Sequence, residues 1–162
     1  MITLVLGGTR SGKSEVAERL AMALPQPVTY VATGVGGDPD MAARIAAHRL
    51  RRPAEWSTVE TVDLVEAVER LQGSLLVDAL GTWVAADMEA ADGAALAAAL
   101  SARSGDAVVV SDEVGLGVHP SSEIGRRFRD RLGEVNRAVA DAADRVLLVV
   151  AGRTLELGRD SE

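Results

Sequence analysis

The chain of 162 residues contains no cysteine, few aromatic residues and a single lysine. Without cysteine it can form neither disulfide bonds nor thiolate sites, which is typical of proteins in a reducing compartment. Aromatic residues make up 2% of the sequence and hydrophobic residues 48%, so the core must consist mainly of alanine, valine, leucine and isoleucine. A core of this composition suits helices packed on a parallel sheet.

Positive charge is also scarce, and long hydrophobic runs are absent. The formal net charge of −7 disfavours binding to nucleic acids and to anionic lipid surfaces. The apolar start at residues 2–6 is too short for a signal peptide, and no segment reaches the roughly 18 apolar residues of a membrane span. The length suits one domain, residues 1–162. The sequence therefore predicts a single-domain cytoplasmic protein with no nucleic-acid partner and no membrane span.

Short apolar runs rich in β-branched residues alternate with helical patterns along the chain. The runs predict buried strands at residues 2–6, 28–32, 74–80, 107–111 and 145–151. The patterns between them predict helices at residues 14–24, 38–51, 62–72, 83–102, with a break at Gly93, and 121–143. This alternation predicts an α/β fold with a parallel sheet. Opposite its apolar stripe, the last helix carries Arg126, Arg127, Arg129 and Arg131.

A glycine-rich segment follows the first predicted strand and precedes the first predicted helix. Its residues fit the phosphate-loop pattern G-x-x-x-x-G-K-[ST] and are Gly7, Gly8, Thr9, Arg10, Ser11, Gly12, Lys13 and Ser14. In such a loop, backbone N–H groups and the N-terminus of the helix surround the phosphates of a nucleotide. The segment predicts a nucleotide site in a P-loop NTPase fold of the RecA-like kind, a three-layer sandwich with a mostly parallel central sheet.

Lys13 is the only lysine among 17 basic residues. An ammonium group is a slim point charge that can reach the β- and γ-phosphates, whereas a guanidinium is too broad for this position. Lys13 is therefore a candidate catalytic residue. Ser14 is a candidate ligand for Mg²⁺, which is the predicted cofactor.

A P-loop enzyme also needs a carboxylate near Mg²⁺, commonly at the end of a neighbouring apolar strand. Asp78 is the first candidate and Asp112 or Glu113 is the next, although each of them could instead be an acid that caps a loop. Asp78 to Gly81 also fit the D-x-x-G pattern of regulatory GTPases. Those proteins read guanine with an N-K-x-D element, and a chain with no second lysine cannot form one, so this class is disfavoured.

One of the two histidines, His48, has two competing interpretations. It shares one face of a predicted helix with Met41 and Ile45, as a half-buried structural histidine would. It is also a nucleophile available at neutral pH. A basic cluster suited to a triphosphate follows it at Arg49, Arg51 and Arg52. From these residues alone, a structural and a catalytic role both remain open.

Several segments, in the same order along nearly the whole chain, make the sequence similar to one family. They are Gly7 to Ser14; Met41 to Ile45 with His48, Arg52, Pro53, Trp56 and Glu60; Asp112 to Pro120; and Arg127 to Asp130 with Asn136. This arrangement resembles the bifunctional adenosylcobinamide kinase / adenosylcobinamide-phosphate guanylyltransferase family of cobalamin synthesis. The P-loop joined to R-I-x-x-H-x-x-x-R-P and E-V-G-x-G-x-x-P is highly specific for it.

The resemblance implies two reactions, with ATP and GTP as nucleotide substrates. Adenosylcobinamide would be phosphorylated on its aminopropanol hydroxyl, and GMP from GTP would then be joined to adenosylcobinamide phosphate through a guanylylated histidine, His48. A homotrimer is implied as well. Besides the P-loop, the nucleotide-binding residues implied are Ala32, Thr33, Gly34, Arg49, Leu50, Arg51, Arg52, Glu60 and Asp78.

The chain departs from the family pattern at three positions. Asp112 stands where the family has asparagine and Asp78 where it has glutamate, which keeps an oxygen ligand at both. His119 lies where an apolar residue is common and is interpreted as loop structure. The alternative function is a monofunctional small-molecule kinase, in which arginines of the last helix stabilise phosphate and His48 is structural. A non-catalytic nucleotide-binding subunit is a second alternative.

Overall fold

The computed structural model describes residues 1–33 and 53–159, which contain a seven-stranded sheet of order β3-β2-β4-β5-β1-β6-β7. The strands are β1 (Ile2–Gly7), β2 (Val28–Ala32), β3 (Ser57–Glu60), β4 (Ser74–Asp78), β5 (Ala107–Asp112), β6 (Arg145–Val150) and β7 (Arg153–Leu157). The helices described are α1 (Lys13–Met22), α3 (Leu64–Arg70), α4 (Leu80–Ala86), α5 (Gly93–Ala102) and α6 (Glu123–Ala142). Neighbouring strands run parallel, except that β6 and β7 pair antiparallel.

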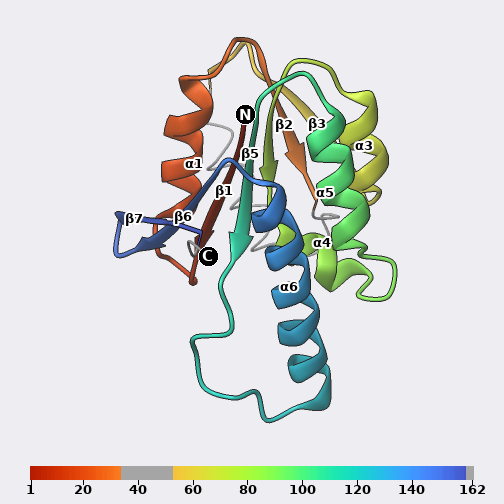
Figure 1. Cartoon of the computed structure of the whole chain (residues 1–162), viewed down its shortest axis with the longest axis vertical. Coiled ribbons are helices and arrows are strands. Elements are labelled where there is room, and N and C mark those ends of the chain that lie inside the picture. The colour runs from red at the N-terminus through yellow and green to blue at the C-terminus, as the bar shows by residue number, and fades with distance from the viewer. Residues whose placement is uncertain (34–52, 160–162) are drawn as a thin grey trace.

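Helices cover both faces of this sheet (Figure 1). On one face, α1 places Val16 in a cluster with Val5 and Val108 from the sheet. On the other face, α3, α4, α5 and α6 pack against alternate residues of the same strands, such as Leu4 and Val109. Successive side chains of a strand point to opposite faces, so these strands are apolar on both sides, as buried parallel strands are. The predicted three-layer α/β sandwich is confirmed.

The five predicted strands correspond to β1, β2, β4, β5 and β6. The prediction is wrong at the end of β4, because the strand stops at Asp78 and Leu80 already begins α4. The apolar runs do not predict β3 and β7. No residue of β3 is fully buried and every residue of β7 is exposed. Edge strands of this kind need few apolar side chains, so hydrophobicity gives little signal for them.

The helix predicted at residues 83–102 is two helices, α4 and α5, joined by residues 87–92. Gly93 does not break a helix as predicted, because it is the first residue of α5. Asp92 caps α5 by accepting hydrogen bonds from the backbone N–H groups of Ala94 and Ala95, at 2.9 and 3.0 Å. A Cβ at Gly93 would lie 2.9 Å from the Cα of Val135 in α6. Glycine at this position therefore permits the close packing of α5 on α6.

The remaining described helices agree with their predictions. Helices α1, α3 and α6 correspond to the patterns at residues 14–24, 62–72 and 121–143, whereas the helix predicted at 38–51 lies outside the described residues. Two arginines of α6 attach it to the connection between α4 and α5: Arg127 pairs with Glu89, and Arg131 Nε donates to the carbonyl oxygen of Met88 at 3.0 Å. Within residues 1–33 and 53–159, none of the helices has the length and apolar character that a membrane crossing requires.

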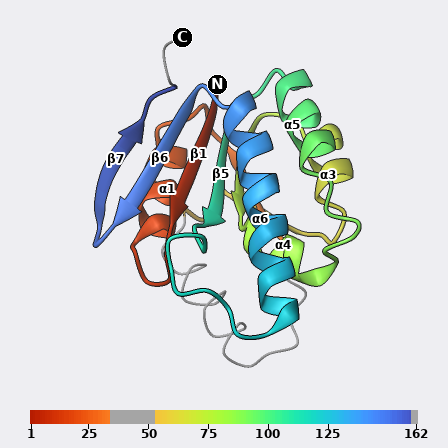
Figure 2. The same cartoon turned by 60° about the horizontal axis from the view of Figure 1, so that its bottom comes forward.

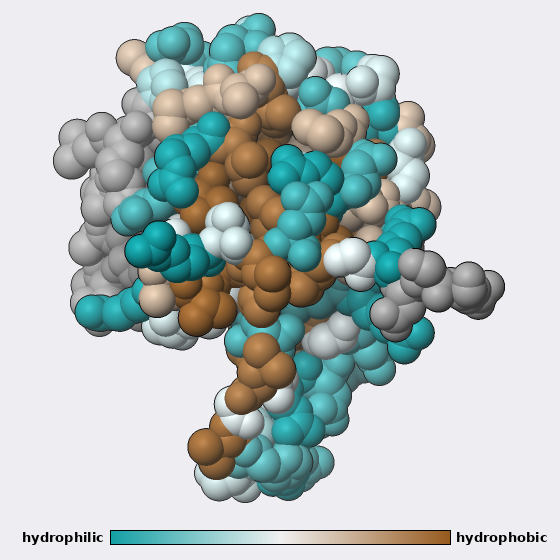
Figure 3. Space-filling model, turned by 60° about the vertical axis from the view of Figure 1, so that its left-hand side comes forward, coloured by the Kyte–Doolittle hydropathy of each residue, from teal (hydrophilic) through white to brown (hydrophobic). Residues whose placement is uncertain are grey.

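The β6–β7 hairpin forms one edge of the sheet, and much of it is exposed. Val150, Leu155 and Leu157 are 60%, 60% and 40% exposed. Leu155 pairs with Leu148 and Leu157 pairs with Val146, so these four side chains share one face of the hairpin. Hydrophobic surface is visible on the side of the molecule that carries α1 and the hairpin (Figure 3).

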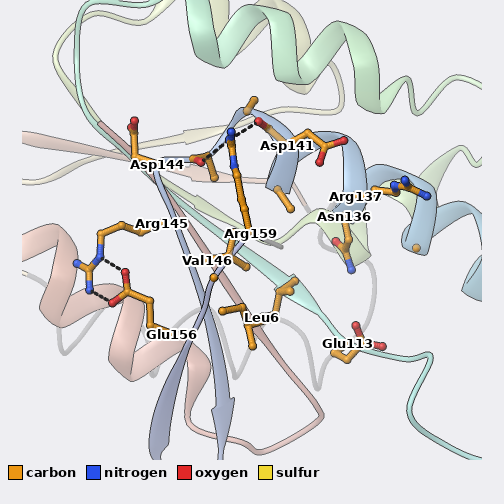
Figure 4. Close-up of a pocket in the computed structure, with 16 residues that line it drawn as sticks. Leu6, Glu113, Asn136, Arg137, Asp141, Asp144, Arg145, Val146, Glu156 and Arg159 are labelled. Carbon is orange, nitrogen blue, oxygen red and sulfur yellow. Dashed lines mark hydrogen bonds and ion pairs between the residues drawn. The ribbon is translucent and has the colours of Figure 1, made fainter. Parts of the chain in front are cut away.

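A hollow of about 790 Å³ lies between α6 and the hairpin, with Leu6 in its lining (Figure 4). Arg145 and Glu156 pair at its rim, with Nη2 2.9 Å from Oε2, and this hydrogen bond lowers the pKa of Glu156. Arg159 Nη2 donates to the carbonyl oxygen of Asp141 at 2.7 Å, close to the end of α6. Because two of the three arginines that line the hollow, Arg145 and Arg159 but not Arg137, already bind protein groups among the described residues, the hollow is a weaker candidate for a phosphate site than the P-loop.

Candidate nucleotide-binding site

The P-loop leaves the carboxyl end of β1 and enters the first turn of α1 (Figure 2). Arg10 and Gly12 have φ angles of 58° and 91°, in the left-handed region that favours glycine. The backbone N–H of Ser11 donates to the carbonyl oxygen of Gly8 at 3.2 Å, which closes the turn. Since α1 begins at Lys13, its free N–H groups and the positive end of its dipole face the loop. The predicted strand–loop–helix arrangement is confirmed.

The turn of the β6–β7 hairpin supports the loop from outside. The backbone N–H of Gly152 donates to the carbonyl oxygen of Ser11 at 2.8 Å. A Cβ at Gly12 would lie 3.3 Å from the Cα of Gly152, so the two backbones approach closely. Gly152 has a φ angle of 72°, which a glycine adopts without strain. The hairpin therefore helps to fix the backbone that would surround a phosphate.

Lys13 lies inside this loop. Its Nζ is 2.8 Å from Oδ1 of Asp112 and 3.4 Å from the carbonyl oxygen of Gly8. The Lys13 side chain is 11% exposed and the Asp112 side chain 31%. Asp112 is the last residue of β5 and lies opposite Gly7 of β1 in the sheet. Asp112 is one of the strand-end acids named from the sequence as candidate metal ligands. Its pairing with Lys13 was not predicted, because that pairing depends on β5 being the neighbour of β1.

Four predicted residues, Ala32, Thr33, Glu60 and Asp78, lie at the carboxyl edge of β2, β3 and β4. Ala32 lies opposite Glu60 on one side and opposite Asp78 on the other. Thr33, which follows Ala32 and is fully buried, has its Oγ1 2.6 Å from the carbonyl oxygen of Ala79. Its hydroxyl also lies 2.6 Å from the Thr82 hydroxyl in α4. These contacts join the end of β2 to the start of α4.

Asp78 is half-buried, and its Oδ2 accepts a hydrogen bond of 2.7 Å from the Tyr30 hydroxyl. Mg²⁺ prefers oxygen ligands and is commonly held by one or two carboxylates together with phosphate oxygens and water. In the described part of the chain, no group of three or more His, Cys, Asp or Glu side chains could hold a metal ion. The Ser14 hydroxyl and the Asp78 carboxylate are oxygen groups of the kind that Mg²⁺ takes beside nucleotide phosphates.

The arginines of α6 contact protein groups near the loop of residues 113–122. Arg126 Nη1 donates to the carbonyl oxygen of Ser121 at 3.0 Å, and Arg129 Nη1 lies 2.7 Å from Nδ1 of His119. With the pairing of Arg127 and Glu89, these contacts hold a loop and a connection in place, so they give no support to a phosphate-stabilising role. His119 is exposed in its loop, as predicted.

The predicted site residues and those that the structure describes do not fully coincide. Predicted residues that lie outside the described part of the chain are Gly34, His48, Arg49, Leu50, Arg51 and Arg52. Tyr30, Thr82 and Gly152 belong to the site and are not predicted. Tyr30 is the only tyrosine of the chain and lies in a predicted strand, which is a weak signal for its place in the site. Thr82 and Gly152 reach the site through the packing of α4 and of the hairpin, which no local pattern encodes.

A lysine inside a P-loop, carboxylates at the ends of adjacent parallel strands and a helix N-terminus facing the loop define a nucleotide-binding protein of the P-loop class. The solved structure of a prototypical ATPase from the type III secretion system of pathogenic bacteria matches this fold with a TM-score of 0.56. The match has 10% sequence identity and covers 91% of this chain and 50% of that one, so it supports the fold alone.

The chain belongs to the cobinamide kinase / cobinamide phosphate guanyltransferase family, whose model matches residues 3–157. It is 42% identical to the bifunctional adenosylcobalamin biosynthesis protein CobP of Pseudomonas aeruginosa, over 97% of each chain. It is also 40% identical to CobU of Escherichia coli and 41% identical to CobU of Salmonella typhimurium, each over 94% of this chain and 97% of the relative. The protein is therefore a bifunctional cobinamide kinase and cobinamide phosphate guanylyltransferase of adenosylcobalamin biosynthesis, and the resemblance in its motifs is confirmed.

Proposed function

We propose that both reactions use a nucleotide held in the P-loop, with Lys13 as the catalytic cation. The observation that carries this proposal is the position of the chain's only lysine, whose Nζ lies inside the loop at the start of α1 and 2.8 Å from Asp112. A fixed cation beside free helix N–H groups can stabilise the charge that develops on phosphate oxygens. The carboxylates nearby have defined partners of their own, Lys13 for Asp112 and Tyr30 for Asp78.

In the kinase reaction, the aminopropanol hydroxyl of adenosylcobinamide attacks the γ-phosphorus of ATP or GTP. The bond from this phosphorus to the bridging oxygen breaks, the nucleoside diphosphate leaves, and the hydroxyl loses its proton. Lys13 and the backbone N–H groups of the loop hold the phosphate oxygens during this transfer. The step needs positioning and charge, and it needs no nucleophilic side chain.

In the guanylyltransferase reaction, a neutral imidazole nitrogen of His48 attacks the α-phosphorus of GTP and pyrophosphate leaves. A phosphate oxygen of adenosylcobinamide phosphate then attacks the same phosphorus. The bond from phosphorus to the histidine breaks, which gives adenosylcobinamide-GDP and restores His48. The further nucleotide contacts that we propose are Ala32, Thr33, Gly34, Arg49, Leu50, Arg51, Arg52, Glu60 and Asp78.

We propose that Ser14 and Asp78 hold Mg²⁺, which when bound neutralises charge on the nucleotide phosphates. We also propose that the enzyme is a homotrimer in the cytoplasm. Support for self-association comes from the face of the hairpin that carries Val150, Leu155 and Leu157, because exposed apolar patches at a sheet edge are typical of contacts between chains.

The intact mass of the protein after incubation with GTP tests the covalent step. The wild-type enzyme should gain the mass of one GMP, and His48→Ala should gain none. The variant should still phosphorylate adenosylcobinamide at a substantial rate, because phosphoryl transfer to a hydroxyl does not require an imidazole. It should therefore accumulate adenosylcobinamide phosphate. A GMP adduct of wild-type extent on His48→Ala would show that another residue is the nucleophile, and His119→Ala would then be measured in the same way.

A further inference from the structure

The ammonium of Lys13 is held from two directions within the protein. Asp112 Oδ1 lies 2.8 Å from Nζ, and the carbonyl oxygen of Gly8 lies 3.4 Å from it. A lysine ammonium has three N–H donors, so these two acceptors leave one donor for a phosphate. The nearer of the two acceptors is charged, and charge-assisted hydrogen bonds are the stronger ones. The direction of the ammonium is therefore determined mainly by Asp112.

Asp112 is itself fixed by a buried amide of α6. Asn136 Nδ2 donates to the carbonyl oxygen of Asp112 at 3.0 Å, and Asn136 Oδ1 accepts a hydrogen bond of 2.5 Å from the Ser111 hydroxyl. Ser111 is fully buried and Asn136 is 8% exposed. On the other side, the backbone N–H of Glu113 donates to the carbonyl oxygen of Gly7 at 3.1 Å. The end of β5 is thus attached both to α6 and to the start of the P-loop.

The carboxylate of Asp112 also has little room to move. A Cβ built at Gly81 of α4 would lie 2.4 Å from Asp112 Oδ2 and 3.3 Å from its Cγ. The first turn of α4 therefore lies directly against one carboxylate oxygen, while Lys13 holds the other. An alanine at position 81 would displace the carboxylate, because a separation of 2.4 Å is far below van der Waals contact.

We propose that Asp112 is a positioning residue, which orients Lys13 in the P-loop at a cost in nucleotide affinity. Its negative charge lies next to the cation that the nucleotide phosphates need, so it competes with them for that cation and repels them. The same contact restricts the ammonium to one place, which favours the transition state of phosphoryl transfer. Asp112 thus weakens binding of the substrate nucleotide and raises the rate at which the bound nucleotide reacts.

This inference rests on the proposed use of the P-loop by the kinase reaction, and Asp112→Asn tests it. Asparagine keeps the shape and an acceptor oxygen but removes the charge. The dissociation constant of ATP or GTP should fall about 3-fold to 10-fold, because a competing anion is removed. The kcat for adenosylcobinamide phosphorylation should fall only about 3-fold to 10-fold, because the amide oxygen of asparagine, the residue that the family has here, still accepts from Lys13 but orients the ammonium less firmly than a charged carboxylate does. If the ion pair were merely structural, Asp112→Asn would lower the unfolding temperature, and tighter nucleotide binding would not accompany a lower kcat.

Gly81→Ala separates position from charge. The variant keeps the Asp112 carboxylate but displaces it, so kcat should fall while nucleotide binding does not tighten. Asp106→Asn is the matched control, because Asp106 pairs with the N-terminal ammonium at 2.6 Å just before the opposite end of β5. It should leave both kcat and the nucleotide dissociation constant unchanged.

Two results would overturn the inference. In the first, Asp112→Asn leaves binding and kcat at wild-type values while Lys13→Ala abolishes activity; the P-loop proposal then stands and the role of Asp112 fails. In the second, Asp112→Asn weakens nucleotide binding and raises the Mg²⁺ concentration required, which would make Asp112 a metal ligand. If instead Lys13→Ala retains wild-type kinase activity, the use of the P-loop itself is wrong.

Discussion

Two aspartates at the ends of neighbouring strands have different partners, and their roles should differ for that reason. Asp112 pairs with a cation, Lys13, whereas Asp78 accepts a hydrogen bond from a neutral phenol, Tyr30. The charge of Asp78 is therefore not balanced by Tyr30. A carboxylate of this kind, half-buried at the edge of the sheet where the P-loop lies, is suited to attract a divalent cation.

Asp78→Asn should reduce kinase turnover at limiting Mg²⁺ by roughly 10-fold to 100-fold, because the amide keeps the shape and loses the charge that attracts the metal. The amide oxygen can still accept the hydrogen bond from Tyr30, so the free energy of unfolding should change by only about 1 kcal/mol. Turnover would be measured as a function of Mg²⁺ concentration, and Tyr30→Phe, which removes the hydrogen bond alone, is the control. An unchanged Mg²⁺ dependence in Asp78→Asn would rule out this role.

The site could be predicted only as far as its chemistry is written in local patterns. The P-loop, Lys13 and the acid that ends β4 were all accessible, because a motif or an apolar run next to a polar residue marks each of them. The pairing of Lys13 with Asp112 was not accessible, because it needs the order of strands in the sheet. The contact between Gly152 and Ser11 joins residues from opposite ends of the chain, and no local pattern encodes it.

At the level of secondary-structure elements, the strands that could be predicted from the sequence are those with buried apolar runs. The five strands with buried runs were predicted, and the two at the edges of the sheet, β3 and β7, were not. The alanine-rich stretch that forms α4 and α5 shows helical propensity throughout, so propensity alone did not find the connection at residues 87–92. The marker of the second helix is instead its capping residue, Asp92.

Removal of the cap of α5 should destabilise the protein without affecting catalysis. Asp92→Ala leaves the N–H groups of Ala94 and Ala95 without their acceptor, which costs about 1 kcal/mol for a cap of this type. The free energy of unfolding in urea measures the loss. Glu69→Ala, at an exposed position in the last turn of α3, is the control and should change stability by less than about 0.5 kcal/mol. Equal effects of the two changes would mean that the cap contributes nothing.

In the molecule as a whole, the β6–β7 hairpin links the P-loop to an exposed apolar face. The turn at Gly152 touches the P-loop, and the two strands that meet there carry Val150, Leu155 and Leu157. Association through this face would therefore bury apolar surface close to the nucleotide site. The hairpin would then support the loop more firmly in an assembly than in an isolated chain.

Leu155→Asp should dissociate the proposed trimer, because it introduces a charge into the apolar face of β7. Light scattering coupled to size-exclusion chromatography measures the mass of each species. Thr154→Asp is the control, because Thr154 pairs with Val149 and lies on the opposite face of the same strand. A wild-type mass of one chain would contradict the trimer, and a trimeric Leu155→Asp would place the interface on another surface.

The most direct test of the account is the measurement of both activities in Lys13→Ala, because a single loop is proposed to serve two reactions. The variant should show no adenosylcobinamide phosphorylation and very little GMP adduct, since loss of this cation removes transition-state stabilisation worth several kcal/mol, about 3 to 4 for comparable contacts. Lys13→Arg should fail as well, because the guanidinium is too broad for the loop. A Lys13→Ala variant that phosphorylates adenosylcobinamide at a rate near that of the wild type would contradict the use of the P-loop by the kinase reaction.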